Sequence, residues 1–120
     1  MSKPRPAQPE AGPAPKSEPG PARVFAALGD RTRLRLLARL SDGRSRSIVA
    51  LSQDSELTRQ AVTKHLRVLE EAGLVTSLRS GRESRFQYRP EPLVEARTWL
   101  DGVAAQWDEA LGRLRDLVED

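Results

Sequence analysis

The sequence predicts a mainly helical domain of the α+β class with one small β-hairpin near its end. Three observations support this prediction. Apolar residues recur at helical spacing in four segments between residues 22 and 72. Two short alternating segments follow at 75–79 and 84–89, joined by Ser-Gly-Arg-Glu. A last segment, from about 93 to 119, again has helical spacing. The expected order is four helices, two strands and a long final helix.

Residues 1–21 differ in composition from the rest of the chain. Seven of the nine prolines lie here, and no large apolar residue follows Met1. Such a segment buries too little apolar surface to offset its chain entropy. We therefore expect a disordered proline-rich tail over residues 1–21 and a folded domain over 22–120.

Capping residues and glycines divide the first three helical segments. The first helix is expected over 22–28, ending at Gly29, and Asp30 is the predicted N-cap of the second, over 32–40. A third short helix is expected over 47–53. The residues predicted to face the core from the second helix are Leu34, Leu37 and Leu40, flanked by Leu36 and Ala38.

The fourth helix has the strongest pattern. Thr58 is its predicted N-cap, the helix runs over 59–72, and Gly73 closes it. At 100° per residue, one face is apolar and the opposite face is polar and free of acids. The apolar face consists of Val62, Leu66, Leu69 and Ala72, and the polar face of Gln60, Thr63, Lys64 and Arg67, with Arg59 at its edge.

A helix of this kind at the end of a helix-turn-helix can read DNA. The N-terminal half of the second helix enters the major groove, where Gln pairs with adenine, Arg with guanine, and Thr with a base or a thymine methyl group. Lys64 suits a phosphate. The alternative is an ordinary amphipathic helix with a polar outer face, which charge alone does not exclude.

The hairpin adds a basic wing next to this helix. Alternation places Phe86 and Tyr88 inward and Arg85, Gln87 and Arg89 outward. The outline is that of a winged helix-turn-helix with double-stranded DNA as its partner. The predicted DNA-binding residues are Thr58, Arg59, Gln60, Thr63, Lys64, Arg67, Arg79, Arg82 and Arg85.

Charge is unevenly distributed although the net charge is only +3. Residues 23–89 contain 14 Arg and Lys against 7 Asp and Glu, whereas residues 90–120 contain 3 against 8. A basic middle and an acidic end indicate two surfaces with different partners. The basic surface suits phosphates.

The final helix is expected to form a homodimer. Its apolar residues are spaced by three or four, close to a heptad seam, and the helix is too long for a domain of this size to cover fully. The helix could pack against its own domain or against a second copy, and we favour the second copy. A twofold dimer would place two recognition helices on one face of DNA, about 34 Å apart. The predicted interface consists of Leu100, Val103, Trp107, Leu111, Leu114 and Val118, joined by Val24, Phe25 and Leu28 of the first helix.

Composition argues against several other functional classes. The chain has no cysteine and one histidine, His65, which we interpret as a packed or hydrogen-bonded residue rather than a metal ligand. Without a glycine-rich phosphate loop or paired acids, no catalytic residue is predicted. No segment is apolar enough to be a signal or a membrane span, so we expect a cytoplasmic protein without a cofactor.

Three stretches resemble the ArsR/SmtB family of arsenical-resistance repressors: LGDRTRLRLLARL, LTRQAVTKHLRVLEEAGLV and SGRESRFQY. The resemblance covers about residues 23–119. It implies a homodimeric winged-helix repressor that leaves an inverted-repeat operator when a signal binds. Genes for family members of this kind often neighbour a gene for a small lipid-binding-like domain. The resemblance therefore also suggests that the protein regulates neighbouring genes or its own gene.

The metal-sensing members of the family differ from this sequence. They place Cys-x-Cys in the helix before the recognition helix, where this chain has SIVALSQD, or use His and Asp on the last helix, which has no histidine here. The resemblance is therefore to members without metal ligands. The sequence specifies no inducer, and a winged-helix protein-interaction module without DNA binding is the alternative.

Overall fold

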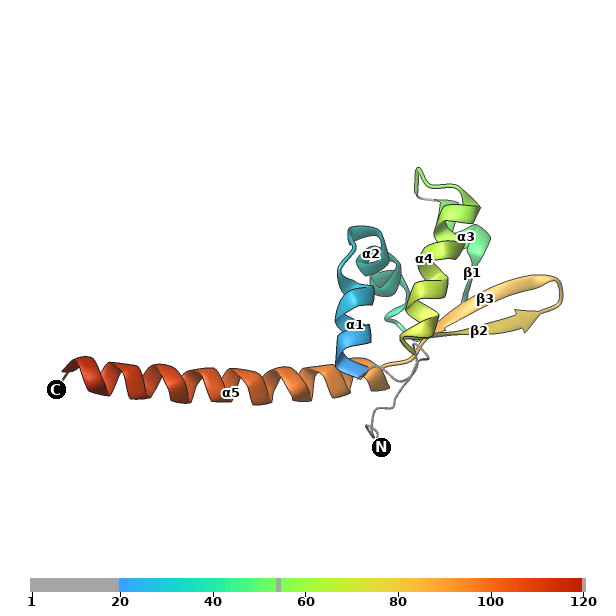
Figure 1. Ribbon diagram of the computed structural model, residues 1–120. Helices are drawn as coiled ribbons and strands as arrows, with labels where there is room; N and C mark the ends of the chain where they lie inside the picture. Colours follow the sequence, from blue (N-terminus) through green and yellow to red (C-terminus); the bar gives the residue numbers. More distant parts are fainter. Residues whose placement is uncertain (1–19, 54, 120) are drawn as a thin grey trace, which may run out of the picture.

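The computed structural model describes residues 20–53 and 55–119, which form a winged helix (Figure 1). Helices α1 to α4 pack together, the β2–β3 hairpin projects from them, and α5 extends away on the other side. The elements are α1 (Gly20–Leu28), α2 (Arg31–Leu40), β1 (Arg46–Ser47), α3 (Ile48–Gln53), α4 (Arg59–Glu71), β2 (Val75–Ser80), β3 (Glu83–Tyr88) and α5 (Glu91–Glu119).

One apolar core joins the helices to the base of the hairpin. Its largest fully buried side chain is Phe86 of β3, and the same cluster includes leucines of α2, α3 and α4. The prediction for α2 was wrong at two positions: Leu34 is 50% exposed and Ala38 is exposed, whereas Leu36, Leu37 and Leu40 are buried as predicted. The core consists of Val24, Ala27, Leu36, Leu37, Leu40, Leu51, Val62, Leu66, Leu69, Leu74, Val75, Phe86 and Ala96.

The sheet has a third strand that the sequence analysis did not predict. The two residues of β1 pair antiparallel with β3, so the order is β1-β3-β2. Arg46 lies opposite Phe86, and Ser47 lies opposite Arg85. The Ser47 hydroxyl also accepts a hydrogen bond from the Ala50 amide and so caps α3. This short strand connects the helix-turn-helix to the wing.

The predicted caps are confirmed. The Asp30 carboxylate accepts from the Arg33 amide at 3.1 Å, and the Thr58 hydroxyl accepts from the Ala61 amide at 3.1 Å. The Arg33 amide also lowers the pKa of Asp30. After α4, Gly73 adopts φ 80°, a left-handed conformation that ends helices and favours glycine.

The first and last helices begin earlier than predicted. Helix α1 starts at Gly20 rather than at residue 22, with Pro21 in its first turn, where proline needs no amide partner. Helix α5 starts at Glu91, with Pro92 likewise in its first turn. The rest of the predicted tail, residues 1–19, lies outside the described residues.

Helix α1 packs on the start of α5 within the same chain. The rings of Phe25 and Trp99 meet at a centroid distance of 5.8 Å, and Phe25 and Leu28 pack against the core. Val24 is only 1% exposed. Its predicted place in a dimer interface is wrong, because its side chain fills the core of its own chain.

None of the helices in residues 20–53 and 55–119 combines the length and apolar character needed to cross a membrane.

Candidate nucleic-acid interface

The recognition helix α4 has one buried and one exposed face, as predicted. Val62, Leu66 and Leu69 are at most 1% exposed and anchor it to the core. Arg59 and Gln60 in the first turn and Lys64 in the second are exposed. Thr63 lies between these faces, and its hydroxyl donates to the Arg59 carbonyl at 2.7 Å. The first two turns thus present polar and basic side chains on a rigid helix.

Arg67 lies further along α4 and faces the root of the wing. Its guanidinium donates to Glu70 at 3.0 Å, and its Cζ lies 6.0 Å from the centre of the Phe86 ring. Glu70 also accepts from the Ser77 hydroxyl of β2 at 2.8 Å. These contacts hold Arg67 at the junction between α4 and the hairpin rather than leaving it as a free surface cation.

The wing ends in a two-residue turn between Ser80 and Glu83, which pair across the hairpin. Gly81 in this turn has φ 61°, which glycine adopts without strain. Arg79 and Arg82 flank the tip, are exposed, and have no hydrogen-bond or ion-pair partner among the described residues. Both are available to an anion outside the chain.

Arg85, predicted to contact DNA, has partners within the chain. Its Nε donates to the Ser45 hydroxyl at 3.0 Å and its Nη2 to the Ser45 carbonyl at 2.9 Å. Its Nη1 donates to Glu83 at 3.0 Å. Gln87 acts similarly, donating to the Gly43 carbonyl at 2.7 Å. The two side chains therefore fasten the segment before β1 to the wing.

A crevice of about 330 Å³ separates the recognition helix from the wing. It brings together Arg59 and Thr63 of α4, Arg82 and Glu83 of the wing turn, and Ser47 before α3. Ser47 was not among the residues predicted for this surface, because only its pairing with β3 brings it here. Two exposed arginines on opposite walls are suited to a backbone phosphate.

His65 is partly buried and hydrogen-bonded. Its Nδ1 lies 3.2 Å from Nη1 of Arg33, which donates to it, and 3.8 Å from a carboxylate oxygen of Asp30. Within the part of the chain that the structure describes, no group of three His, Cys, Asp or Glu could hold a metal ion.

Comparison with known proteins identifies the family. Residues 28–77 match a family model described as a helix-turn-helix domain. An uncharacterized HTH-type transcriptional regulator of Bacillus subtilis (strain 168), YuzN, is 43% identical, over 58% of this chain and 83% of its own. The solved ArsR-like transcriptional regulator from Rhodococcus sp. RHA1 is 35% identical, with a TM-score of 0.71 over 82% of this chain and 92% of its own. The chain belongs to the ArsR family of transcriptional regulators.

The protein is therefore a DNA-binding transcriptional regulator, and its family consists of transcriptional regulators rather than enzymes. A further solved structure, the winged helix-turn-helix DNA-binding domain Mb0332 from Mycobacterium bovis, is described as homodimeric and as a possible ArsR-family transcriptional regulator. It is 26% identical, with a TM-score of 0.56 over 77% of this chain and 82% of its own.

Proposed function

We propose that this ArsR-family protein is a cytoplasmic homodimeric repressor that binds an inverted-repeat operator, including one in its own promoter. The observation that carries the proposal is the crevice between α4 and the wing, which sets Arg59 and Arg82 on opposite sides of one gap beside the exposed Gln60 and Lys64.

Each part of this surface has a proposed role. Gln60 and Thr63 read base edges, while Thr58, Arg59 and Lys64 position the helix on the backbone. Arg79 and Arg82 grip phosphates beside the groove. Arg67 and Arg85 hold the wing against α4 and β1, because both are engaged within the chain, and any contact they make with DNA is secondary.

The exposed apolar side of α5 supports the dimer. Trp107 is 64% exposed, and Leu111 and Leu114 are each 56% exposed, although they follow the near-heptad spacing of an interface. A monomer rarely leaves so much contiguous apolar surface in water. The homodimeric state of the relative from Mycobacterium bovis favours a second copy as the partner. Leu100, Val103 and Val118 extend this seam, and Phe25 and Leu28 lie beside it.

The test is fluorescence anisotropy of the purified protein on labelled DNA from its own promoter region, with unrelated DNA as competitor. Gln60→Ala should weaken binding to the operator about 5- to 100-fold while leaving unrelated DNA unaffected, because a good bidentate base contact contributes about 1–3 kcal/mol of discrimination. Gln106→Ala removes an exposed glutamine of α5 and is the matched control. Equal affinity for promoter and unrelated DNA would contradict the proposal and favour a protein-interaction module.

A further inference from the structure

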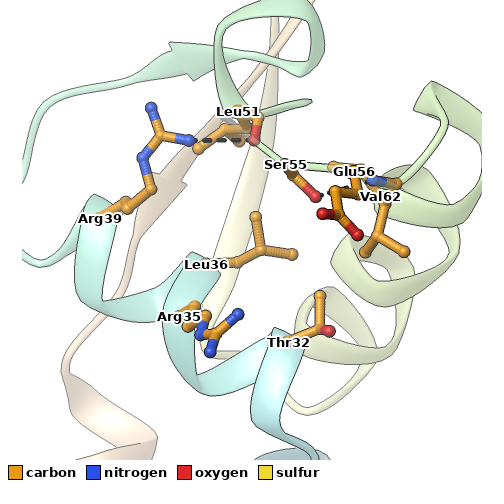
Figure 2. Close-up of a pocket in the computed structure, with 9 residues that line it drawn as sticks. Thr32, Arg35, Leu36, Arg39, Leu51, Ser55, Glu56 and Val62 are labelled. Carbon is orange, nitrogen blue, oxygen red and sulfur yellow. Dashed lines mark hydrogen bonds between the residues drawn. The ribbon is translucent and has the colours of Figure 1, made fainter. Parts of the chain in front are cut away.

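A cavity of about 470 Å³ lies between α2, α3 and the segment that leads into the recognition helix (Figure 2). Its apolar lining includes Leu36, Leu51 and Val62, which are at most 4% exposed and belong to the core. Small-molecule sites are commonly of this size, with an apolar floor and a few polar groups.

Two opposite charges line this cavity. Arg35 comes from α2 and Glu56 from the segment before α4, and Figure 2 shows them on different sides of the space. Neither side chain has a hydrogen-bond or ion-pair partner among the described residues, and they do not pair with each other. By contrast, Arg39 at the upper wall is engaged, donating to the carbonyls of Leu51 and Ala50.

We propose that this cavity binds a small zwitterion with an apolar body, of the class of the apolar amino acids. The ligand carboxylate pairs with Arg35, its ammonium group pairs with Glu56, and its apolar part packs against Leu57, the partly exposed apolar side chain of the lining. An anion alone would leave Glu56 unpaired and adjacent to like charge, and a cation alone would do the same at Arg35. A ligand that carries both charges pairs with both Arg35 and Glu56.

The position of the cavity makes the ligand an effector of the proposed repressor, and this part of the inference rests on the proposed function. Val62 of α4 and Leu51 of α3 both line the cavity, so a bound ligand lies beside both helices of the helix-turn-helix. A ligand shifts a conformational equilibrium when it binds one arrangement of these helices better than the other. Binding itself needs no DNA, so it is tested separately.

The experiment titrates the ¹⁵N-labelled full chain with three probes that share one skeleton: L-phenylalanine, 3-phenylpropionate and 2-phenylethylamine. They carry both charges, only the negative charge and only the positive charge, respectively. We expect L-phenylalanine to shift the amides of Leu36, Leu51 and Val62 saturably. The other two probes should bind about tenfold or more weakly, because each lacks one charge-assisted hydrogen bond.

Two variants assign the charges. Arg35→Gln should reduce the affinity for L-phenylalanine to that for 2-phenylethylamine and leave 2-phenylethylamine unchanged. Glu56→Gln should reduce the affinity for L-phenylalanine to that for 3-phenylpropionate and leave the affinity for 3-phenylpropionate unchanged. Arg31→Gln is the matched control, since Arg31 is exposed one turn earlier on α2 and does not line the cavity. Because all three positions are exposed, the variants should fold, and their spectra report this directly.

Three outcomes would overturn the assignment. One is the absence of saturable shifts with L-phenylalanine at about 10 mM, which is on the order of ten times a weak millimolar Kd. The others are shifts confined to α5 and equal affinity for the three probes. If L-phenylalanine binds as described and the promoter DNA is not recognised, the cavity assignment stands and the repressor proposal fails. If DNA is bound and no probe enters the cavity, the reverse holds.

Discussion

Nη1 of Arg33 lies 3.2 Å from Nδ1 of His65, so one side chain of α2 reaches the recognition helix. The same guanidinium donates through Nε to the Ala27 carbonyl and through Nη2 to the Ala26 carbonyl, in the last turn of α1. Because α1 packs on α5, Arg33 connects the helix layer that carries the proposed dimer seam with the helix that carries the DNA surface.

Arg33→Met should lower the free energy of unfolding by about 1.5–3 kcal/mol, the usual range for a hydrogen bond to a charged group. The substitution leaves two carbonyls at the end of α1 and the His65 nitrogen without their donor. Urea unfolding followed by circular dichroism measures the change. Arg31→Met, at an exposed position of the same helix, should change it by less than about 0.5 kcal/mol. Equal effects of the two substitutions would show that the hydrogen bonds of Arg33 do not stabilise the fold.

Asp30 should make stability depend on pH below 5. Its pKa is lowered in the folded protein, chiefly by the Arg33 amide, so its contribution is present above its unfolded pKa near 3.8 and is lost as pH falls through the lower folded pKa. Asp30→Asn retains a capping oxygen and removes the titration. Between pH 5 and pH 3, the parent should therefore lose more stability than the Asn variant. Identical losses in urea unfolding at the two pH values would contradict this prediction.

Substitutions of Arg82 and of Arg85 should have different effects, because we propose that Arg82 contacts DNA and that Arg85 holds the wing in place. Arg82→Ala should weaken binding to all DNA sequences alike and reduce the slope of log affinity against log salt by about 1, with unchanged protein stability. The measurement is fluorescence anisotropy between about 50 and 200 mM salt, a range over which a protein with several phosphate contacts loses about 10³-fold or more in affinity. Arg97→Ala, which removes an exposed arginine of α5, is the control and should leave the slope unchanged.

Arg85→Ala should instead lower the free energy of unfolding by about 1–3 kcal/mol, because the Ser45 carbonyl and hydroxyl lose their donor. A reduced salt slope with unchanged stability would show that Arg85 binds DNA directly, as the sequence analysis predicted.

The double substitution Trp107→Ala with Leu111→Ala should convert the protein to a monomer at micromolar concentration. Truncating a large buried residue typically costs about 2–5 kcal/mol, and each change occurs twice in a twofold interface. Analytical ultracentrifugation measures the mass, and anisotropy on the operator should show a sharp loss of affinity.

Leu34→Ala is the control for that experiment, because Leu34 is a leucine on α2 that is nearly as exposed as Leu111. It should leave the dimer intact. A double variant that remains dimeric, or a monomer that binds the operator as tightly as the parent, would contradict the proposed seam.

Local chemistry determined most of the elements from the sequence alone. Asp30 and Thr58 mark helix starts because their side-chain oxygens satisfy free amides within three residues, and Gly73 marks a helix end because it tolerates a positive φ. The two faces of α4 follow from the period of the helix, so the exposure of Gln60 and Lys64 was predictable from the sequence alone.

Only the tertiary structure decided what depends on neighbours distant in sequence. Strand β1 exists because Arg46 and Ser47 meet β3 some 40 residues later, and the same approach gives Arg85 its partners at Ser45. Helical spacing placed Leu34 and Leu36 on opposite edges of the apolar face of α2, and the packing of the chain buried Leu36 and left Leu34 exposed. The cavity between Arg35 and Glu56 likewise arises from how α2, α3 and α4 pack, because a sequence records which charges exist but not which ones the packed chain leaves unpaired.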